Sequence, residues 1–270
     1  MTSLRRLQDI PGWELGTVDG KIGRCHDVLF DDTDWAIRYI VADTGKWLPG
    51  RKVLISPLAV RALDEATGTL ELSLTKDQIK NAPPLDSDAP VSRRYEIAFN
   101  WHYDWPNYWT GPSIRDPHLY PTLLHRPEEL EQRSDLQDQF LDKLPEEQTH
   151  LRSAQEILEY RTITGDTDIG NIVDLLVDKE SWIIRFMIVD ARKWLPEVKW
   201  LLISHHWVEK IDWAERSIAA KLTVDQLKRS PKFDPSMEVD REYESCTTFT
   251  ACPIIGRIRA IARIEPPYYP

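Results

Sequence analysis

Two aspartate–arginine pairs have the residue types that could carry out chemistry in this chain. Asp27 and Arg38 recur as Asp174 and Arg185, at an offset of 147 positions. An aspartate could serve as a general acid and an arginine as an electrophile if both faced one cleft. We expect them to lie in neighbouring strands, however, where cross-strand charge pairs are ordinary. Their duplication also favours a structural role, because residues that shape a fold recur in each copy.

The histidines and serines form no recognisable catalytic or metal-binding pattern. His205 and His206 are adjacent and would face opposite sides of a strand, so they are poorly placed to hold one metal ion. His102, His118 and His125 lie among aromatic and proline residues, at a spacing that matches no ligand pattern. Neither Leu-Ile-Ser triplet carries the Gly-x-Ser-x-Gly signature of a nucleophile. We therefore expect no enzyme activity, no metal site and no cofactor.

Aromatic side chains are the better candidates, as groups that dock a partner. Trp47 and Trp194 each stand in a Lys-Trp-Leu-Pro tetrapeptide that should turn after a strand, where they either anchor a partner or plug a barrel mouth. A denser group lies in the tail FNWHYDWPNYW at 99–109, and its members either cover the surface between the two halves, which we favour, or form a docking patch. That group comprises Trp101, Tyr103, Trp105, Tyr108 and Trp109.

The repeated tetrapeptide belongs to a longer repeat, which we place at 1–96 and 150–244. At the offset of 147, Ile22-Gly23 matches Ile169-Gly170. A one-residue insertion then changes the offset to 148, so that the segment TKDQIK at 75–80 matches TVDQLK at 223–228. A repeat of this length is typical of a whole domain rather than of a short solenoid unit.

Within each repeat, apolar residues alternate with the period of two that is typical of strands. The segments WAIRYIVAD (35–43) and WIIRFMIVD (182–190) are rich in β-branched and aromatic residues. Thr75 and Thr223 are each followed three residues later by Gln, which predicts a capping box at the start of a short helix. We expect each repeat to form about six short strands, closed into a small barrel, and one short helix.

Taken together, these motifs resemble those of the PRC-barrel domain. The resemblance is carried by Gly-x-x-x-Asp at 23–27 and 170–174, by Trp-x-Ile-Arg at 35–38 and 182–185, by Lys-Trp-Leu-Pro and by Leu-Ile-Ser. It is closest to the bacterial tandem PRC-barrel proteins. It implies a mainly β fold with two small PRC-type β-barrels in tandem, joined by an aromatic and charged linker.

In its known settings this family acts as an adaptor, in the photosynthetic reaction centre H subunit and in a ribosome-maturation factor. The resemblance therefore implies a non-enzymatic binding or assembly module, whose partner is another protein or protein complex. The alternatives are a reaction-centre H-like accessory protein and a ribosome-assembly adaptor, with an enzyme last. A homo-oligomer is also open, as is a chain whose two barrels pack with pseudo-two-fold symmetry.

Four segments follow from the repeat: repeat one at 1–96, aromatic tail and charged linker at 97–149, repeat two at 150–244, and an atypical tail at 245–270. That last segment lacks the aromatic sequence found after repeat one. One codon spelling of CTTFTACPIIG (246–256), read one base earlier, gives LYDFYGLPYYW, which shares Tyr, Pro and Tyr-Trp with 99–109. We interpret the tail as read out of frame, the alternative being a divergent natural tail.

Composition narrows the classes of partner. The formal net charge of −10 argues against direct binding to nucleic acid, which usually needs a basic face. The apolar runs are strand-sized, so we expect no membrane span, and MTSLRRLQDIPGW lacks the apolar core of a signal peptide. These features predict a cytoplasmic protein. Cys25, Cys246 and Cys252 form no metal pattern, and we expect no structural disulfide.

Overall fold

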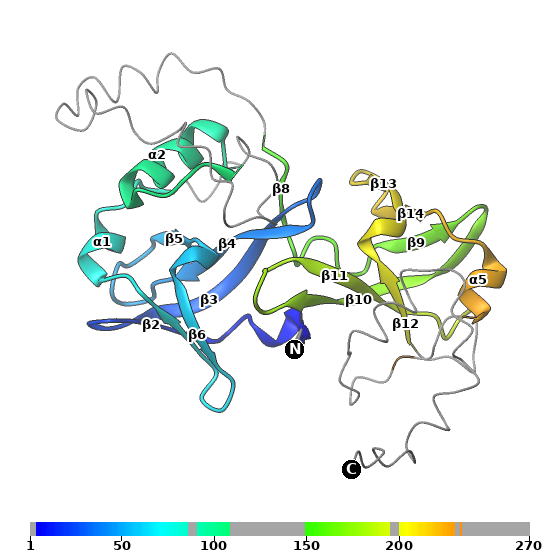
Figure 1. Ribbon diagram of the computed structural model, residues 1–270, viewed down its shortest axis with the longest axis horizontal. Helices are drawn as coiled ribbons and strands as arrows, with labels where there is room; N and C mark the ends of the chain where they lie inside the picture. Colours follow the sequence, from blue (N-terminus) through cyan, green and yellow to red (C-terminus); the bar gives the residue numbers. More distant parts are fainter. Residues whose placement is uncertain (1–3, 86–90, 109–148, 195–199, 230–232, 234–270) are drawn as a thin grey trace, which may run out of the picture. The chain divides into compact units, whose positions relative to one another are not determined.

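The computed structural model describes residues 4–85, 91–108, 149–194, 200–229 and 233 of the 270-residue chain (Figure 1). Two mixed sheets of seven strands contain most of its regular structure, which confirms the predicted mainly β class. The chain divides into two compact units. We name Asp9–Gln155 the first unit, and Met1–Gln8 together with Glu156–Pro270 the second unit.

The sheet of the first unit has the strand order β5-β4-β3-β2-β7-β6, and β8 pairs with β3. Only β2 and β7 pair in parallel. The strands are β2 (Glu14–Thr17), β3 (Gly20–Asp31), β4 (Ala36–Asp43), β5 (Lys52–Ile55), β6 (Val60–Asp64), β7 (Thr69–Leu72) and β8 (Leu151–Ser153). The helices are the 3-10 turn η2 (Pro57–Ala59) and the α-helices α1 (Lys76–Lys80) and α2 (Arg93–Tyr103), while the 3-10 turn η1 (Leu7–Asp9) spans the boundary between the units.

The second unit repeats this arrangement in the order β12-β11-β10-β9-β14-β13, with β1 paired to β10. The equivalent pair β9 and β14 is again parallel. Its elements are β1 (Leu4–Arg6), β9 (Arg161–Thr164), β10 (Thr167–Asp178), β11 (Ile184–Asp190), β12 (Trp200–Ser204), β13 (Val208–Asp212), β14 (Ser217–Ala220), the 3-10 turn η4 (His205–Trp207) and α5 (Val224–Arg229). The sequence repeat is thus a repeat of topology.

The predicted closure of each sheet into a barrel is not seen. A closed barrel needs hydrogen bonds between the two end strands of the sheet. In the described part of the chain, no ladder joins β5 to β6 or β12 to β13, so both sheets are open. Alternation along a strand predicts which faces are apolar, but it does not specify how the two edges of a sheet meet.

Each sheet takes its seventh strand from the other repeat. Leu4 and Leu151 occupy equivalent places in the sequence repeat, yet β1 pairs with β10 and β8 pairs with β3. The register matches Leu4 with Asp178 and Leu151 with Asp31. The compact units therefore differ from the contiguous repeats at 1–96 and 150–244 by one exchanged strand each.

The glycine of each Gly-x-x-x-Asp motif allows two backbone segments to approach closely. Gly23 has φ +145° and Gly170 has φ +134°, both outside the usual range for L side chains. A Cβ on Gly23 would stand 2.0 Å from the carbonyl oxygen of Asp43, and one on Gly170 would stand 1.9 Å from that of Asp190. A bulge follows in each strand, at Cys25–Asp27 in β3 and at 172–174 in β10.

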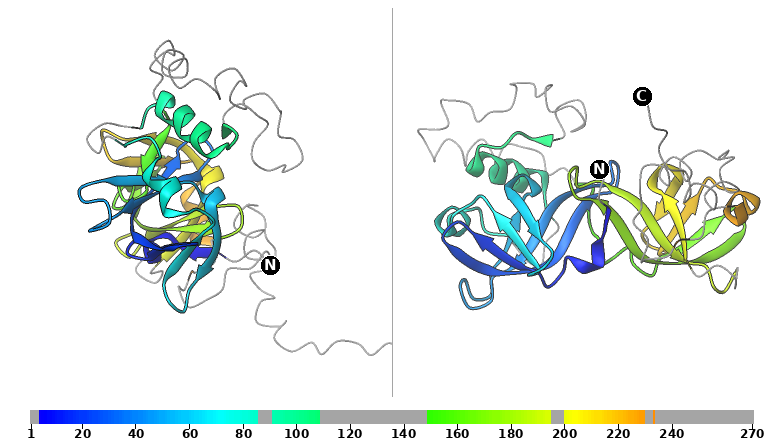
Figure 2. Two further views of the ribbon diagram at one scale, coloured as in Figure 1. Left: turned by 90° about the vertical axis from the view of Figure 1, so that its left-hand side faces the viewer. Right: turned by 60° about the horizontal axis from the view of Figure 1, so that its bottom comes forward.

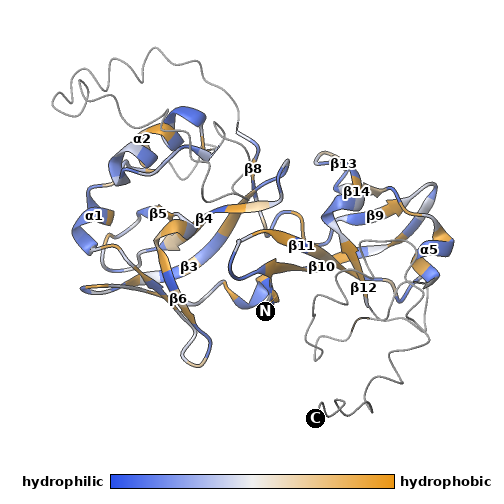
Figure 3. Ribbon diagram, in the orientation of Figure 1, coloured by the Kyte–Doolittle hydropathy of each residue, from blue (hydrophilic) through white to orange (hydrophobic). Residues whose placement is uncertain are grey.

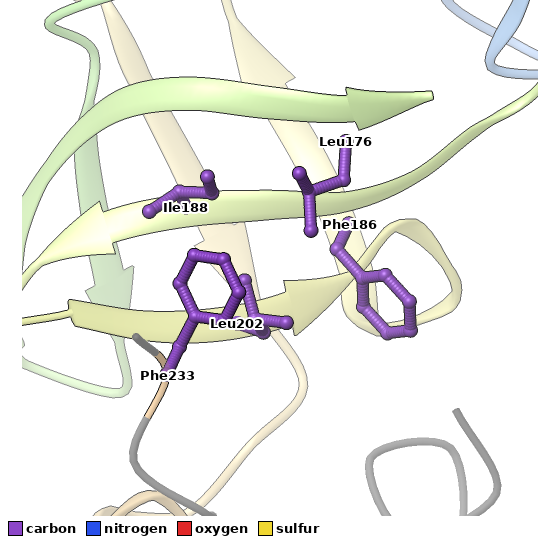
Figure 4. Packing of buried hydrophobic residues seen from close by; sticks show 5 residues of the cluster. All are labelled: Leu176, Phe186, Ile188, Leu202 and Phe233. Carbon is purple, nitrogen blue, oxygen red and sulfur yellow. The ribbon is translucent and has the colours of Figure 1, made fainter. Parts of the chain in front are cut away.

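Equivalent faces of the two sheets hold the apolar clusters. In the second unit the cluster consists of Leu176, Phe186, Ile188, Leu202 and Phe233 (Figure 4). Figure 3 shows hydrophobic residues concentrated along β10 and β11 of that sheet. In the first unit the equivalent face is built on Tyr39, Val41, Leu54 and Phe99. Helix α2 supplies Phe99 and lies over this sheet (Figure 2).

Candidate functional site

The Lys-Trp-Leu-Pro turn of the first unit joins β4 to β5 and has a fixed backbone. The Thr44 side chain is buried beneath it, and its Oγ1 lies 2.7 Å from the carbonyl oxygens of both Leu48 and Arg51. The Trp47 amide donates to the Thr44 carbonyl at 3.0 Å. Because one buried hydroxyl reaches two carbonyls of the turn, the backbone on both sides of Trp47 is held in place.

Arg51 attaches the turn to helix α1. Its guanidinium donates to the carbonyl oxygens of Lys80 at 2.9 Å and Ala82 at 2.6 Å. From the other side, His102 Nε2 lies 2.8 Å from the carbonyl oxygen of Gln78. These side chains satisfy carbonyls that the end of a helix leaves without intrahelical partners.

Trp47 itself is half-buried, beside the exposed cation of Lys46. The ion pairs recorded for the described residues include none from Lys46, Arg51 or Lys52. An accessible indole on a fixed turn with cationic neighbours is suited to contact a partner, and it offers no nucleophile or base for catalysis.

The second turn shares its entry geometry but not its chemistry. The Trp194 amide donates to the Ala191 carbonyl at 3.0 Å, as Trp47 does to Thr44, and Trp194 is also half-buried. Alanine replaces the threonine that fastens the first turn. Arg192 binds Asp190 through Nε at 2.9 Å and Nη2 at 2.5 Å, so this cation is compensated locally. Residues 195–199, with the Leu and Pro of the motif, lie outside the described residues.

The aromatic tail packs inside the first unit, whereas we expected it to cover the surface between the two halves. Trp101 is buried, and Tyr103 and Trp105 are half-buried against the cluster around Phe99. The Tyr103 and Trp105 rings stack with centroids 4.5 Å apart. This packing favours a role as a cover over a role as a docking patch. Trp109 lies outside the described residues.

A buried carboxylate ties this cover to the sheet, and sequence reasoning missed it. Glu96 is fully buried and accepts hydrogen bonds from Tyr39 Oη at 3.0 Å, Tyr108 Oη at 2.8 Å and Arg93 Nη1 at 2.8 Å. Burial raises the pKa of Glu96, although Arg93 opposes the shift. Burial and the nearby Glu96 also raise the pKa of both phenols. One signal in the sequence was the recurrence of Arg93 and Glu96 as Arg241 and Glu244, and another was Tyr39 where the second repeat has Phe186.

The predicted Asp27–Arg38 pair does not form. Strand register places Asp27 opposite Val41, and Arg38 Nη2 instead donates to Asp34 Oδ2 at 2.8 Å. In the second unit Arg185 likewise binds an aspartate at the end of β10, at 3.1 Å. The pairing failed because two residues on adjacent strands meet only when the register brings them opposite each other.

Asp27 and Asp174 instead hold the exchanged strands. Ser153 Oγ, at the end of β8, donates to Asp27 Oδ2 at 2.6 Å. Arg6 Nε, at the end of β1, donates to Asp174 Oδ2 at 2.6 Å, and the Gln8 amide donates to Asp174 Oδ1 at 3.1 Å. Both repeated aspartates thus serve strand exchange, which supports the structural reading of their duplication.

The remaining candidates for chemistry do not come together. His205 and His206 lie in η4 with ring centroids 3.9 Å apart, and not on opposite sides of a strand as predicted. Within the described ranges, no three histidine, cysteine or acidic side chains are grouped so as to hold a metal ion. Cys25 is buried as a free thiol, and burial together with the nearby Asp27 raises its pKa to about 12. A thiol in that state is a poor nucleophile.

No protein-family model matches this chain, and no curated protein matches it either. Across the part of the chain that the structure describes, no helix has the length and apolarity needed to cross a membrane.

Proposed function

We propose that this chain is a non-enzymatic binding module of the tandem PRC-barrel kind, which docks onto another protein or protein complex through the Trp47 turn. The observation that carries the proposal is a half-buried Trp47 on a turn whose backbone is fastened by Thr44 and Arg51. The resemblance of the repeated motifs to PRC-barrel sequences supports the class of protein.

The physical argument concerns the entropy of binding. Tryptophan is enriched among the residues that dominate binding energy, because it offers a large contact area. A side chain on a mobile loop must be ordered when the partner binds, which reduces the affinity. Hydrogen bonds from Thr44 and Arg51 order this turn in advance, so more of the contact energy of Trp47 remains available.

The residues first considered for chemistry support a non-enzymatic role. Asp27 binds the exchanged strand β8, and Arg38 binds Asp34 in the turn that follows β3. Each of these side chains is therefore occupied by the fold.

Site-specific crosslinking in living cells tests the proposal. A photoreactive phenylalanine analogue in place of Trp47 should capture a discrete protein adduct. The same analogue in place of Val18, which is 57% exposed in the β2–β3 hairpin, is the matched control and should not. Identical adducts from both positions, or none from position 47 under several growth conditions, would show that this turn does not dock a partner.

A further inference from the structure

We propose that the Trp47 turn recognises an acidic segment of its protein partner, in which carboxylates flank an apolar side chain, and that the Trp194 turn does not. This inference rests on the proposed docking function and adds the chemistry of the partner. It follows from the different ways in which the two copies of the turn handle their cations.

The first turn concentrates positive charge around its indole. Lys46 is exposed next to Trp47, and Lys52 begins the strand that leaves the turn. The two hydrogen bonds of Arg51 to α1 place the end of that helix, with the exposed Lys80, beside the turn. Arg51 donates to carbonyl oxygens and forms no ion pair with a carboxylate of the described residues.

Asp43 is the one carboxylate within 43–52. Its Oδ1 accepts the Gly45 amide at 2.9 Å, and it lies opposite Lys52 in the β4–β5 ladder. The segment 43–52 therefore carries three cations and one anion, in a chain with a formal net charge of −10. An excess of positive charge at one place on an acidic protein attracts an acidic partner and disfavours a basic one.

The second turn has a smaller excess, because 190–199 contains three cations and two anions. Arg192 binds Asp190 through two nitrogens, and this hydrogen bonding lowers the pKa of Asp190. Among the described residues of that turn, Lys193 is the exposed cation that Asp190 does not bind. Without a threonine at position 191, the turn also lacks the hydroxyl that fastens the first one. The two tryptophans thus present similar surface area in different electrostatic settings.

Charge and aromatic contact have separate tasks in this scheme. Exposed ion pairs contribute little affinity individually and are weakened by salt. We therefore assign the affinity to packing on Trp47, and the selection of an acidic segment to Lys46, Arg51 and Lys52. Binding should consequently weaken with salt and also depend on the indole.

Fluorescence anisotropy with the full chain tests this inference. The probe is a fluorescein-labelled oligoglutamate peptide with one central phenylalanine, and the control probe carries lysine in place of glutamate. Lys46→Glu and Trp47→Ala should each weaken binding of the glutamate probe about tenfold, whereas the matched changes Lys193→Glu and Trp194→Ala should leave it within about twofold. Raising the salt to about 0.15 M should weaken binding by the wild type.

Several results would overturn the inference: absence of saturable binding, equal losses from the two turns, or equal affinity for the lysine probe. Lys46 is exposed, so Lys46→Glu should leave the fold intact. If Trp47→Ala unfolds the chain, Trp47→Leu takes its place. A protein adduct at position 47 without binding of the glutamate probe would refute the acidic chemistry and leave the docking function standing. Binding of the probe without any adduct in cells would refute the docking function instead.

Discussion

Removing the carboxylate of Asp174 should release the exchanged strand β1 from the second unit. Asp174 is almost fully buried and accepts three hydrogen bonds: Arg6 Nε at 2.6 Å, the Gln8 amide at 3.1 Å and the Leu175 amide at 2.8 Å. In Asp174→Ala these donors lose their acceptor, and two of them belong to the segment that holds β1 in place.

The expected loss of unfolding free energy is about 3 kcal/mol. A bond to a charged acceptor contributes about 1.5 kcal/mol net, which gives about 3 kcal/mol for the two amides. The Arg6 side chain is 41% exposed, so solvent screening leaves its ion pair a fraction of a kcal/mol. Burial raises the pKa of Asp174, which shows that desolvation of its charge is unfavourable. Asp174→Ala removes this desolvation cost, and the gain offsets the loss of the Arg6 ion pair.

Urea unfolding measures the total loss, and amide hydrogen exchange locates it. In Asp174→Ala, exchange should accelerate first in the segment containing Leu4–Arg6, because β1 is held to β10 through three paired residues. Asp27→Ala is the matched control in the first unit. It removes bonds from Ser153 Oγ and the Val28 amide. Because Asp27 is only half-buried, each bond should contribute about 1 kcal/mol, so the change should cost about 2 kcal/mol and act on β8.

The reasoning about strand exchange is refuted if β1 stays as protected in Asp174→Ala as in the wild type. It is also refuted if Asp174→Ala opens β8, or if Asp27→Ala opens β1, because each aspartate would then act on its own repeat.

Three further changes test the packing of the first unit. Gly23→Ala should lower the unfolding free energy by about 3 kcal/mol in urea titrations, since its Cβ meets the Asp43 carbonyl, whereas Gly12→Ala, with open space around it, should cost about 1 kcal/mol. Tyr39→Phe should cost about 1.5 kcal/mol in the same assay by removing a hydrogen bond to the buried Glu96, and no loss would show that bond to be unimportant. Because burial raises the pKa of Glu96, the folded chain retains that proton above pH 4.5; the stability of the wild type relative to Glu96→Gln should therefore fall as pH rises from 4.5, and a rise would contradict the assignment.

Local features of this fold could be predicted because the groups involved lie close together in the sequence. The Thr75–Gln78 capping box forms as expected: the Gln78 amide donates to Thr75 Oγ1 at 3.2 Å, and the Thr75 amide donates to Gln78 Oε1 at 2.9 Å. Runs of β-branched and aromatic residues likewise marked β4 and β11 as buried strands. Such features depend on rotamers and backbone angles within a few residues.

Contacts between distant segments could not be predicted in the same way. The Glu96 cluster joins β4 to α2, and its members Tyr39 and Glu96 are 57 residues apart. The pattern of residues along a strand does not specify which helix will pack over that strand. We expected the aromatic tail to cover the surface between the two halves, whereas Phe99 packs with residues of β4 and β5 within the first unit.

The sequence by itself determined that one β-rich unit occurs twice, with the same turns, glycines and caps in each copy. Only the tertiary structure decided that the first strands are exchanged, which joins Arg6 to Asp174 across 168 residues and Ser153 to Asp27 across 126. The physical reason is that β1 and β8 have equivalent sequences and could hydrogen-bond to either long strand. An aspartate stands at both sites, so the choice between β3 and β10 is made by chain geometry, which no local pattern records.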